Sequence, residues 1–272
     1  MFWKKSSWID ESEKDDSPKD HLPEGEVTRF GYQKVPSVQK ENLVRRHFDT
    51  VAKKYDFMNT ILSFGTHHLW KRTAIKMTGI NPGDQIIDIC GGTGDLSILA
   101  AGAGAPSSRV ILYDINWAMM VRGKPKVEKS IFGENICYVQ GDAERISFPD
   151  GIFDSALVGF GIRNLTNMEK GFREMYRVLR PGGKLMCLEF SKPTSRVFRR
   201  LYDFYSFHIM PLLGWVITGS KKAYTHLPES IRMFPLPNEL SAMLEDIGFT
   251  EISYRNLTNG IAVIHLAKKR RL

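Results

Sequence analysis

The chain has 272 residues, of which 42% are hydrophobic and 25% charged, a composition typical of a globular protein with one substantial core. Its formal net charge of +8 favours contact with an anionic surface, either nucleic acid or acidic lipid. No apolar run reaches the roughly 20 residues of a membrane-spanning helix. The longest run, from Ile209, is broken by Pro211 and Gly214, which excludes a bilayer-spanning protein.

Residues 1–36 are predicted to form an acidic, disordered tail, followed by one domain over residues 37–272. The amino-terminal sequence lacks the apolar core of a signal peptide. It is also too acidic for a mitochondrial transit peptide. We therefore expect a cytoplasmic protein.

Residues 37–80 are predicted to be mostly helical. An amphipathic helix over Val38–Tyr55 is indicated by helically spaced apolar residues, namely Val44, Phe48, Val51, Ala52 and Tyr55. A second helical segment contains His67 and His68. Adjacent residues point in different directions on a helix, and neither histidine has a partner at metal-ligand spacing, so no metal site is predicted.

From residue 85 onward, strands alternate with helical segments. Five strands are predicted at Gln85–Cys90, Arg109–Asp114, Ile136–Gln140, Ser155–Gly159 and Lys184–Glu189. Crossovers long enough for a helix imply a parallel sheet. A closing pair, Thr250–Asn256 and Gly260–Ala267, predicts an antiparallel hairpin. The expected fold is α/β and Rossmann-like, a seven-stranded, mostly parallel sheet with helices on both faces.

Two segments depart from simple alternation. The helix that follows the second strand contains Gly123 and Pro125, so we expect it to end early or to kink there. The turn Pro181-Gly182-Gly183 is predicted to stop a helix after Leu179. Residues 192–236, rich in aromatic and basic residues, are long enough to form a lid over a substrate.

The stretch QIIDICGGTGD ends the first strand in a glycine-rich turn, where open α/β sheets bind ligands. Glycines let the backbone approach a ligand closely. Ser97 stands where a dinucleotide fingerprint has its third glycine, and the Gly-Lys-Ser/Thr ending of a P-loop is absent. The flanking Asp88 and Asp95 would repel a pyrophosphate. S-adenosylmethionine, a sulfonium cation without phosphate, suits this setting.

Acidic residues at the ends of the next strands fit the same cofactor. Asp114 lies twenty residues after Gly94, where a carboxylate can accept both ribose hydroxyl hydrogens. Asp142 is placed to accept the adenine amino group, and Ala143 leaves room for the ring. The ordered succession of these residues is a stronger signal than any one of them.

Stretches such as VAKKYDFMN, DICGGTGDL, GFGIRNL, LEFSKP and YSFHIMP run along the chain from about Thr28 to Lys268. In them the sequence resembles the class I S-adenosylmethionine-dependent methyltransferases, and within these the ubiquinone/menaquinone biosynthesis C-methyltransferase family. Many methyltransferases share the glycine motif. FGIRN, and LEFSKP followed by YSFH, are far more specific.

The resemblance implies cofactor contacts at Thr93, Asp114, Asp142 and Ala143. The predicted cofactor site also includes Gly91 and Gly94 of the glycine-rich turn, and Gly159 at the end of the fourth strand. The family commonly has serine where this chain has Gly159. The hydrogen bond of that hydroxyl is therefore either missing or supplied by water.

By the same resemblance, Arg163, Asn164 and Tyr55 are catalytic candidates. Arg163 is sometimes cast as a base that acts through water. An arginine stays protonated above pH 12, so we favour a role in holding a phenolate. The alternatives are a structural ion pair for Arg163 and a buried aromatic of the first helix for Tyr55.

The implied reaction moves a methyl group from S-adenosylmethionine to a ring carbon of a reduced polyprenyl quinol, in menaquinone or ubiquinone biosynthesis. Expected partners are this quinol, a second copy of the chain, and an anionic surface on the inner face of the plasma membrane. Four basic residues would touch that surface, namely Arg199, Arg200, Lys221 and Lys222.

Other functions remain open on the sequence. One is a catalytically idle scaffold that binds S-adenosylmethionine in a quinone-making assembly, and another is a class I methyltransferase for a different small molecule. A nucleic-acid substrate is not expected, because the position after the fourth strand lacks the Asn/Asp-Pro-Pro-aromatic motif of adenine methylation. Benzoquinol and naphthoquinol acceptors both fit the sequence.

Overall fold

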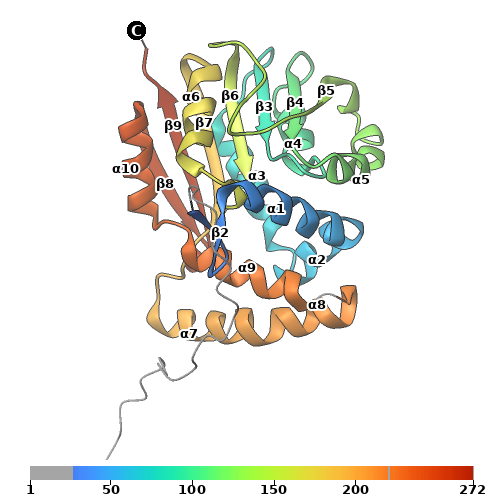
Figure 1. Cartoon of the computed structure of the whole chain (residues 1–272). Helices are drawn as coiled ribbons and strands as arrows, with labels where there is room; N and C mark the ends of the chain where they lie inside the picture. The colour runs from blue at the N-terminus through green and yellow to red at the C-terminus, as the bar shows by residue number, and fades with distance from the viewer. Residues whose placement is uncertain (1–26, 220, 272) are drawn as a thin grey trace, which may run out of the picture.

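The computed structural model describes residues 27–219 and 221–271 (Figure 1). The predicted tail over residues 1–26 lies outside the described residues. Residues 27–36, which we assigned to the same tail, instead form strands β1 (Val27–Phe30) and β2 (Gln33–Pro36), so that boundary was wrong. The two strands pair antiparallel. Thr28 Oγ1 anchors this hairpin to the domain by donating to the Thr166 carbonyl at 3.1 Å.

The central sheet has seven strands in the order β5-β4-β3-β6-β7-β9-β8. The strands are β3 (Gln85–Ile89), β4 (Arg109–Asp114), β5 (Ile136–Gln140), β6 (Phe153–Gly159), β7 (Leu179–Phe190), β8 (Phe249–Leu257) and β9 (Ala262–Lys269). Strands β3 to β7 pair in parallel, and β9 pairs antiparallel with both β7 and β8. The predicted fold, including its antiparallel carboxyl-terminal pair, is confirmed.

Helices cover both faces of this sheet (Figure 1). One core packs α6 (Met168–Val178) and α10 (Pro237–Ile247) against residues such as Ile87. The other packs α3 (Thr66–Thr78), α4 (Asp95–Ala103) and α5 (Trp117–Glu128) against residues such as Ile86. The neighbours Ile86 and Ile87 serve opposite cores because successive strand side chains alternate between faces.

Two local predictions were wrong in part. Helix α5 does not end early at Gly123 or Pro125 but runs to Glu128, although Pro125 has no amide hydrogen to donate. Helix α6 ends at Val178, and β7 begins at the next residue. The expected Pro181-Gly182-Gly183 turn therefore lies within β7, where pairing with β6 is irregular and its register shifts between Phe153 and Ser155.

The amino-terminal region is helical, but its first helix is divided. Helix α1 (Ser37–Val51) and helix α2 (Tyr55–Leu62) are separated by a 3-10 turn at Ala52–Lys54. The break places Tyr55 at the start of α2 and not at the end of α1. Among the described residues, no helix is both long and apolar enough to cross a membrane.

Residues 192–236 form α7 (Arg196–Phe204), a π-helical turn at Tyr205–Ile209, α8 (Met210–Thr218) and α9 (Lys221–Met233). In Figure 1 these orange helices lie below the sheet, with α1 and α2 between. A third apolar cluster joins the two layers through Val51, Met58, Leu62, Met210 and Tyr224. The region that we expected to act as a lid therefore packs on the amino-terminal helices.

Candidate active site

The turn after β3 needs glycine for both conformation and space. Gly92 and Gly94 have φ values of +54° and +82°, which L-residues with side chains rarely adopt. A Cβ on Gly91 would lie 3.0 Å from the Asp88 carbonyl oxygen, and one on Gly94 would lie 2.9 Å from Val127 Cγ2. The turn therefore presents bare backbone at the carboxyl end of β3.

Asp114 is fixed beside this turn, at the end of β4. Its Oδ2 accepts a hydrogen bond from the Gly92 amide at 2.8 Å, and its Oδ1 accepts one from the Asn116 amide at 2.7 Å. Burial raises the pKa of Asp114, and the backbone hydrogen bonds partly oppose that rise. The carboxylate is thus held in one orientation before any ligand arrives.

A cavity of about 530 Å³ opens over Asp114, and we call it the cofactor cavity. Four of the predicted cofactor residues line it, namely Asp114, Asp142, Ala143 and Gly159. Three others, Gly91, Thr93 and Gly94, do not line it, whereas their neighbours Cys90 and Gly92 do. Helix α1 covers one side of the cavity through Val44 and Arg45, which sequence reasoning did not include.

Packing explains why glycine stands at position 159, which the sequence alone did not indicate. A Cβ on this residue would lie 2.4 Å from Leu96 Cδ1. The Leu96 side chain occupies the space where a serine side chain would begin.

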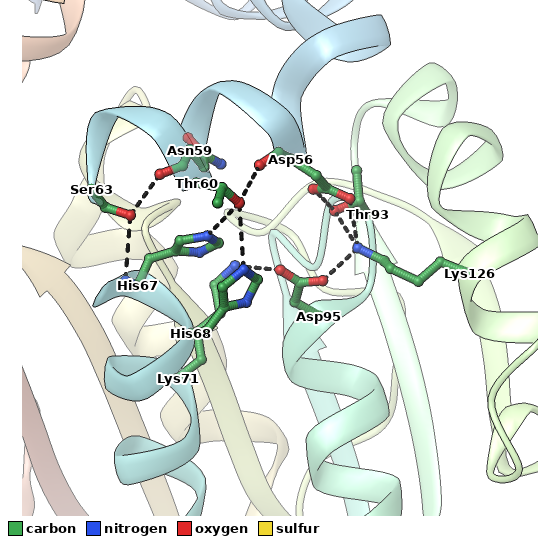
Figure 2. Close-up of polar contacts among 10 residues, drawn as sticks. All are labelled: Asp56, Asn59, Thr60, Ser63, His67, His68, Lys71, Thr93, Asp95 and Lys126. Carbon is green, nitrogen blue, oxygen red and sulfur yellow. Dashed lines mark hydrogen bonds and ion pairs between the residues drawn. The ribbon is translucent and has the colours of Figure 1, made fainter. Parts of the chain in front are cut away.

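The acids that flank the glycine turn are not free carboxylates. Asp95 Oδ2 pairs with Lys71 Nζ at 2.6 Å, and Asp95 Oδ1 pairs with Lys126 (Figure 2). Burial alone would raise the pKa of Asp95, but the two ammonium groups outweigh it and hold that pKa well below its ordinary value. Our argument that Asp88 and Asp95 repel a pyrophosphate was therefore wrong for Asp95.

Asp88 is fully buried, and its Oδ2 accepts a 2.6 Å hydrogen bond from Ser97 Oγ. Burial raises the pKa of Asp88 to about 7. This contact explains why serine occupies the position of a third glycine. Only Asp114, of the three carboxylates near the turn, lines the cofactor cavity.

The two adjacent histidines converge, contrary to our expectation. Their Nε2 atoms lie 3.2 Å (His67) and 3.4 Å (His68) from Thr60 Oγ1, and their ring centroids are 3.8 Å apart (Figure 2). Together with Asp95 they form a group whose ligand atoms lie within 4.8 Å of one another. A metal ion there would have to compete with Lys71 and Lys126 for Asp95, so we assign none.

A second cavity, of about 350 Å³, lies between the sheet and the helices of residues 192–236, and we call it the apolar cavity. Aromatic and aliphatic side chains dominate its wall, including Trp70, Phe190, Phe198, Tyr202 and Met210. It shares four lining residues with the cofactor cavity, namely Phe48, Tyr55, Phe160 and Asn164. Two of the three predicted catalytic residues, Tyr55 and Asn164, therefore lie at the junction of the cavities.

The third predicted catalytic residue, Arg163, lines the apolar cavity and also forms a buried ion pair. Its Nη1 donates at 2.6 Å both to Glu189 Oε1 and to the Phe160 carbonyl. Among the described residues, Arg163 Nε, Asn164 Nδ2 and Glu189 Oε2 have no hydrogen-bond partner. Because buried polar atoms normally have hydrogen-bond partners, these three unpaired atoms favour the binding of a polar ligand group here.

Sequence reasoning missed Glu189, His47 and His226. An acid inside the apolar run LMCLEF is the signal that could have found Glu189. Both histidines line the apolar cavity. Burial lowers the pKa of His47 to about 4 and that of His226 to about 3, with nearby Arg163 acting in the same direction. Both rings are therefore neutral near pH 7.

Comparison with known proteins identifies the family of this chain. Residues 36–269 match the model of the ubiE/COQ5 methyltransferase family. The ubiquinone/menaquinone biosynthesis C-methyltransferase UbiE of Pseudomonas putida (strain W619) is 46% identical over 239 residues, which cover 88% of this chain and 93% of that protein. The protein of the same name from Hahella chejuensis is 44% identical over 91% of this chain and 100% of its own length.

Two solved structures share the fold at low sequence identity. A S-adenosylmethionine-dependent methyltransferase of Thermotoga maritima, a possible histamine N-methyltransferase, has a TM-score of 0.59 at 18% identity and covers 84% of this chain and 100% of its own. A Haemonchus contortus phosphoethanolamine N-methyltransferase in complex with S-adenosyl-L-methionine has a TM-score of 0.55 at 16% identity, covering 74% and 52% of the two chains.

Proposed function

The chain belongs to the ubiE/COQ5 methyltransferase family, and on that premise we propose that it methylates a ring carbon of a reduced polyprenyl quinol. It is a S-adenosylmethionine-dependent methyltransferase with a Rossmann-like fold. Its relatives are named for ubiquinone and menaquinone biosynthesis. Because this chain is similar to them over most of its length, we assign it to the same biosynthesis. Both the benzoquinol and the naphthoquinol remain candidate acceptors.

One observation carries this proposal, namely that the cofactor cavity and the apolar cavity share the lining residues Tyr55 and Asn164. S-adenosylmethionine supplies an electrophilic methyl group when it is bound. The cofactor cavity fits this molecule because Gly92 of the glycine turn lines it, and because its carboxylates Asp114 and Asp142 suit ribose hydroxyls and an adenine amino group. The apolar cavity suits a quinol ring and the first part of its prenyl tail.

Arg163 supports the proposal from the apolar side of the junction. A hydroquinone carbon becomes more nucleophilic as its hydroxyl loses a proton, so the site gains by stabilising the phenolate oxygen. The Arg163 guanidinium carries a positive charge into the apolar cavity, while Glu189 fixes its orientation. We assign Arg163 to phenolate binding and Asn164 Nδ2 to a hydrogen bond with the same ring.

The outer surface of residues 192–236 supports contact with a membrane, from which a polyprenyl substrate would enter. On α7, Val197, Leu201 and Phe204 form an exposed stripe at helical spacing, and Trp215 and Val216 extend the apolar surface on α8. Arg196, Arg199 and Arg200 are also exposed on α7. We propose that this surface touches anionic lipid. The side chains of Lys221 and Lys222, also assigned to lipid, lie outside the described residues.

A series of reduced acceptors with tails of increasing length tests this assignment. We expect the KM for the quinol to fall as isoprene units are added, until the apolar cavity is filled, with kcat nearly constant. Equal KM values for tail-free and prenylated acceptors would contradict the role of the apolar cavity. A nucleic acid or an unrelated small molecule methylated faster than any quinol would contradict the proposed function itself.

A further inference from the structure

Helices α1 and α2 form a roof over the active site. Helix α1 lines the cofactor cavity, and Tyr55, the first residue of α2, lines both cavities. The 3-10 turn between the helices separates their hydrogen-bonding patterns and leaves α2 to be positioned by contacts of its own. The geometry of Tyr55 therefore depends on what holds the first turn of α2.

Asp56, the next residue, makes that contact. Its Oδ1 accepts a hydrogen bond from Thr93 Oγ1 in the glycine turn at 2.7 Å. Its Oδ2 accepts one from Lys126 Nζ on α5, also at 2.7 Å. One carboxylate thus joins the roof to the two elements that border the cofactor cavity (Figure 2).

These contacts belong to a charge-balanced cluster of Asp56, Asp95, Lys71 and Lys126, which we call the latch. The Lys71 and Asp95 side chains are only 10% and 19% exposed, so solvent screens their pairing weakly. Burial lowers the pKa of Lys126, but Asp95 and Asp56 reverse that effect and raise it above its ordinary value. Asp95 and Lys126 therefore both stay charged around neutral pH.

Helix α5 packs closely against the glycine turn, and this packing positions Lys126 in the latch. A Cβ on Gly123 would lie 2.3 Å from the Thr93 carbonyl oxygen, so α5 touches the backbone of the turn directly. Lys126 follows three residues later on the same helix and reaches Thr93 Oγ1 at 3.1 Å. The glycine turn is thereby held between α5 and Asp56.

We propose that Asp56 is a positioning residue for methyl transfer, which ties the first turn of α2 to the glycine turn and so holds the Tyr55 hydroxyl at the junction of the two cavities. Tyr55 immediately precedes Asp56 in the same first turn of α2, so a shift of that turn moves the Tyr55 side chain with it. This inference rests on the proposed function, because it assigns Asp56 a role in that reaction. A displacement of about 1 Å at a reacting centre can cost on the order of a hundredfold in rate.

The test is a double-mutant cycle on kcat with the variants Asp56→Ala, Tyr55→Phe and their combination. We expect Asp56→Ala to lower kcat by roughly ten- to a hundredfold, with the KM for the quinol changed less than about threefold. In the Tyr55→Phe background the same change should cost less than about threefold, because the hydroxyl that Asp56 positions is already gone. Asp56→Asn should be intermediate, since its amide oxygen can still accept from Thr93.

Hydrogen exchange over residues 37–62 supplies a readout that does not need activity. Asp56→Ala should exchange about tenfold faster there, and the control Glu128→Ala, which breaks an exposed pair with Lys124 on α5, should not. Multiplicative losses of kcat in the cycle, or unchanged kcat or exchange in Asp56→Ala, would overturn the inference. A wild-type chain that methylates no quinol would instead overturn the proposed function, and the exchange result would still decide whether Asp56 holds the roof.

Discussion

Arg163 Nη1 donates to Glu189 Oε1 at 2.6 Å beneath the apolar cavity, and the two side chains are only 8% and 2% exposed. The pair links the segment after β6 to the end of β7, at the edge of the sheet where the two cavities meet. It also keeps a positive charge inside an apolar wall. Arg163 is therefore a buried ion-pair residue that also lines the apolar cavity, which we propose as the substrate site.

Glu189→Gln should therefore impair both stability and turnover. Removing one charge of a buried pair leaves the other uncompensated, and we expect a loss of about 3–5 kcal/mol in unfolding free energy. The freed guanidinium should also lower kcat by at least about tenfold. Denaturant unfolding and steady-state kinetics measure the two effects. Glu169→Gln, which breaks an exposed pair with Arg173, is the control and should change neither. Unchanged kcat would contradict the assigned role of Glu189.

Gly123→Ala should weaken cofactor binding, although it improves helix propensity by about 1 kcal/mol. The new Cβ would meet the Thr93 backbone, with the carbonyl oxygen 2.3 Å away, and backbone cannot yield as a flexible side chain does. We expect the Kd of S-adenosylhomocysteine, measured by calorimetry, to rise at least about tenfold. The neighbouring exposed substitution Lys124→Ala should leave it unchanged. Wild-type affinity in Gly123→Ala would show that the contact between α5 and the turn is dispensable.

Asp88→Asn should change how stability depends on pH. The pKa of Asp88 is raised from 3.8 to about 7, so the stability that the protonated group contributes is fully present below pH 3.8 and is lost as pH rises through about 7. Wild-type Tm should therefore fall relative to Asp88→Asn by several degrees between pH 5 and pH 8. Asp246→Asn, an exposed acid on α10, is the control. Parallel Tm profiles of wild type and Asp88→Asn would rule out a raised pKa.

The exposed apolar stripe predicts membrane contact. The triple variant Val197→Ser, Phe204→Ser and Trp215→Ser should bind phosphatidylglycerol vesicles at least about tenfold more weakly than wild type in co-sedimentation. Binding should also weaken with added salt, because exposed arginines also lie on α7. Ile131→Ser, at an even more exposed apolar position outside residues 192–236, should bind like wild type. Vesicle binding that the triple variant retains in full would contradict a lipid-facing role for α7 and α8.

The regular part of the fold followed directly from the sequence. The strands β4 and β5 match their predicted bounds, because each is a short, mostly apolar run that ends in a polar turn. Predictions from local propensity were wrong where tertiary contacts determine the secondary structure. Gly123 reads as a helix breaker in sequence, but it is the residue that allows α5 to touch Thr93. The hairpin at residues 27–36 was missed because its strands are short and partly exposed.

The candidate site was only partly predictable for a similar reason. Asp114, Asp142 and Ala143 end strands in a regular order, and they line the cofactor cavity as a group. Thr93 was expected to face the cofactor, whereas its hydroxyl donates to Asp56, a partner 37 residues away in the chain. Folding brings Glu189 into a hydrogen bond with Arg163 and places His226 on the same cavity wall as Arg163, and no spacing in the sequence marks either relationship.

The most direct test of the central claim is the fate of a ¹³C-labelled methyl group from S-adenosylmethionine, supplied with reduced demethylmenaquinone and demethylubiquinone analogues in separate reactions. We expect the NMR spectrum of the product to show the label on a ring carbon of at least one quinol, with formation slowed at least about a hundredfold in Arg163→Ala. That result would also identify the acceptor ring. Label on oxygen, or no label in either quinol while calorimetry still shows that S-adenosylhomocysteine binds, would contradict C-methylation of a quinol.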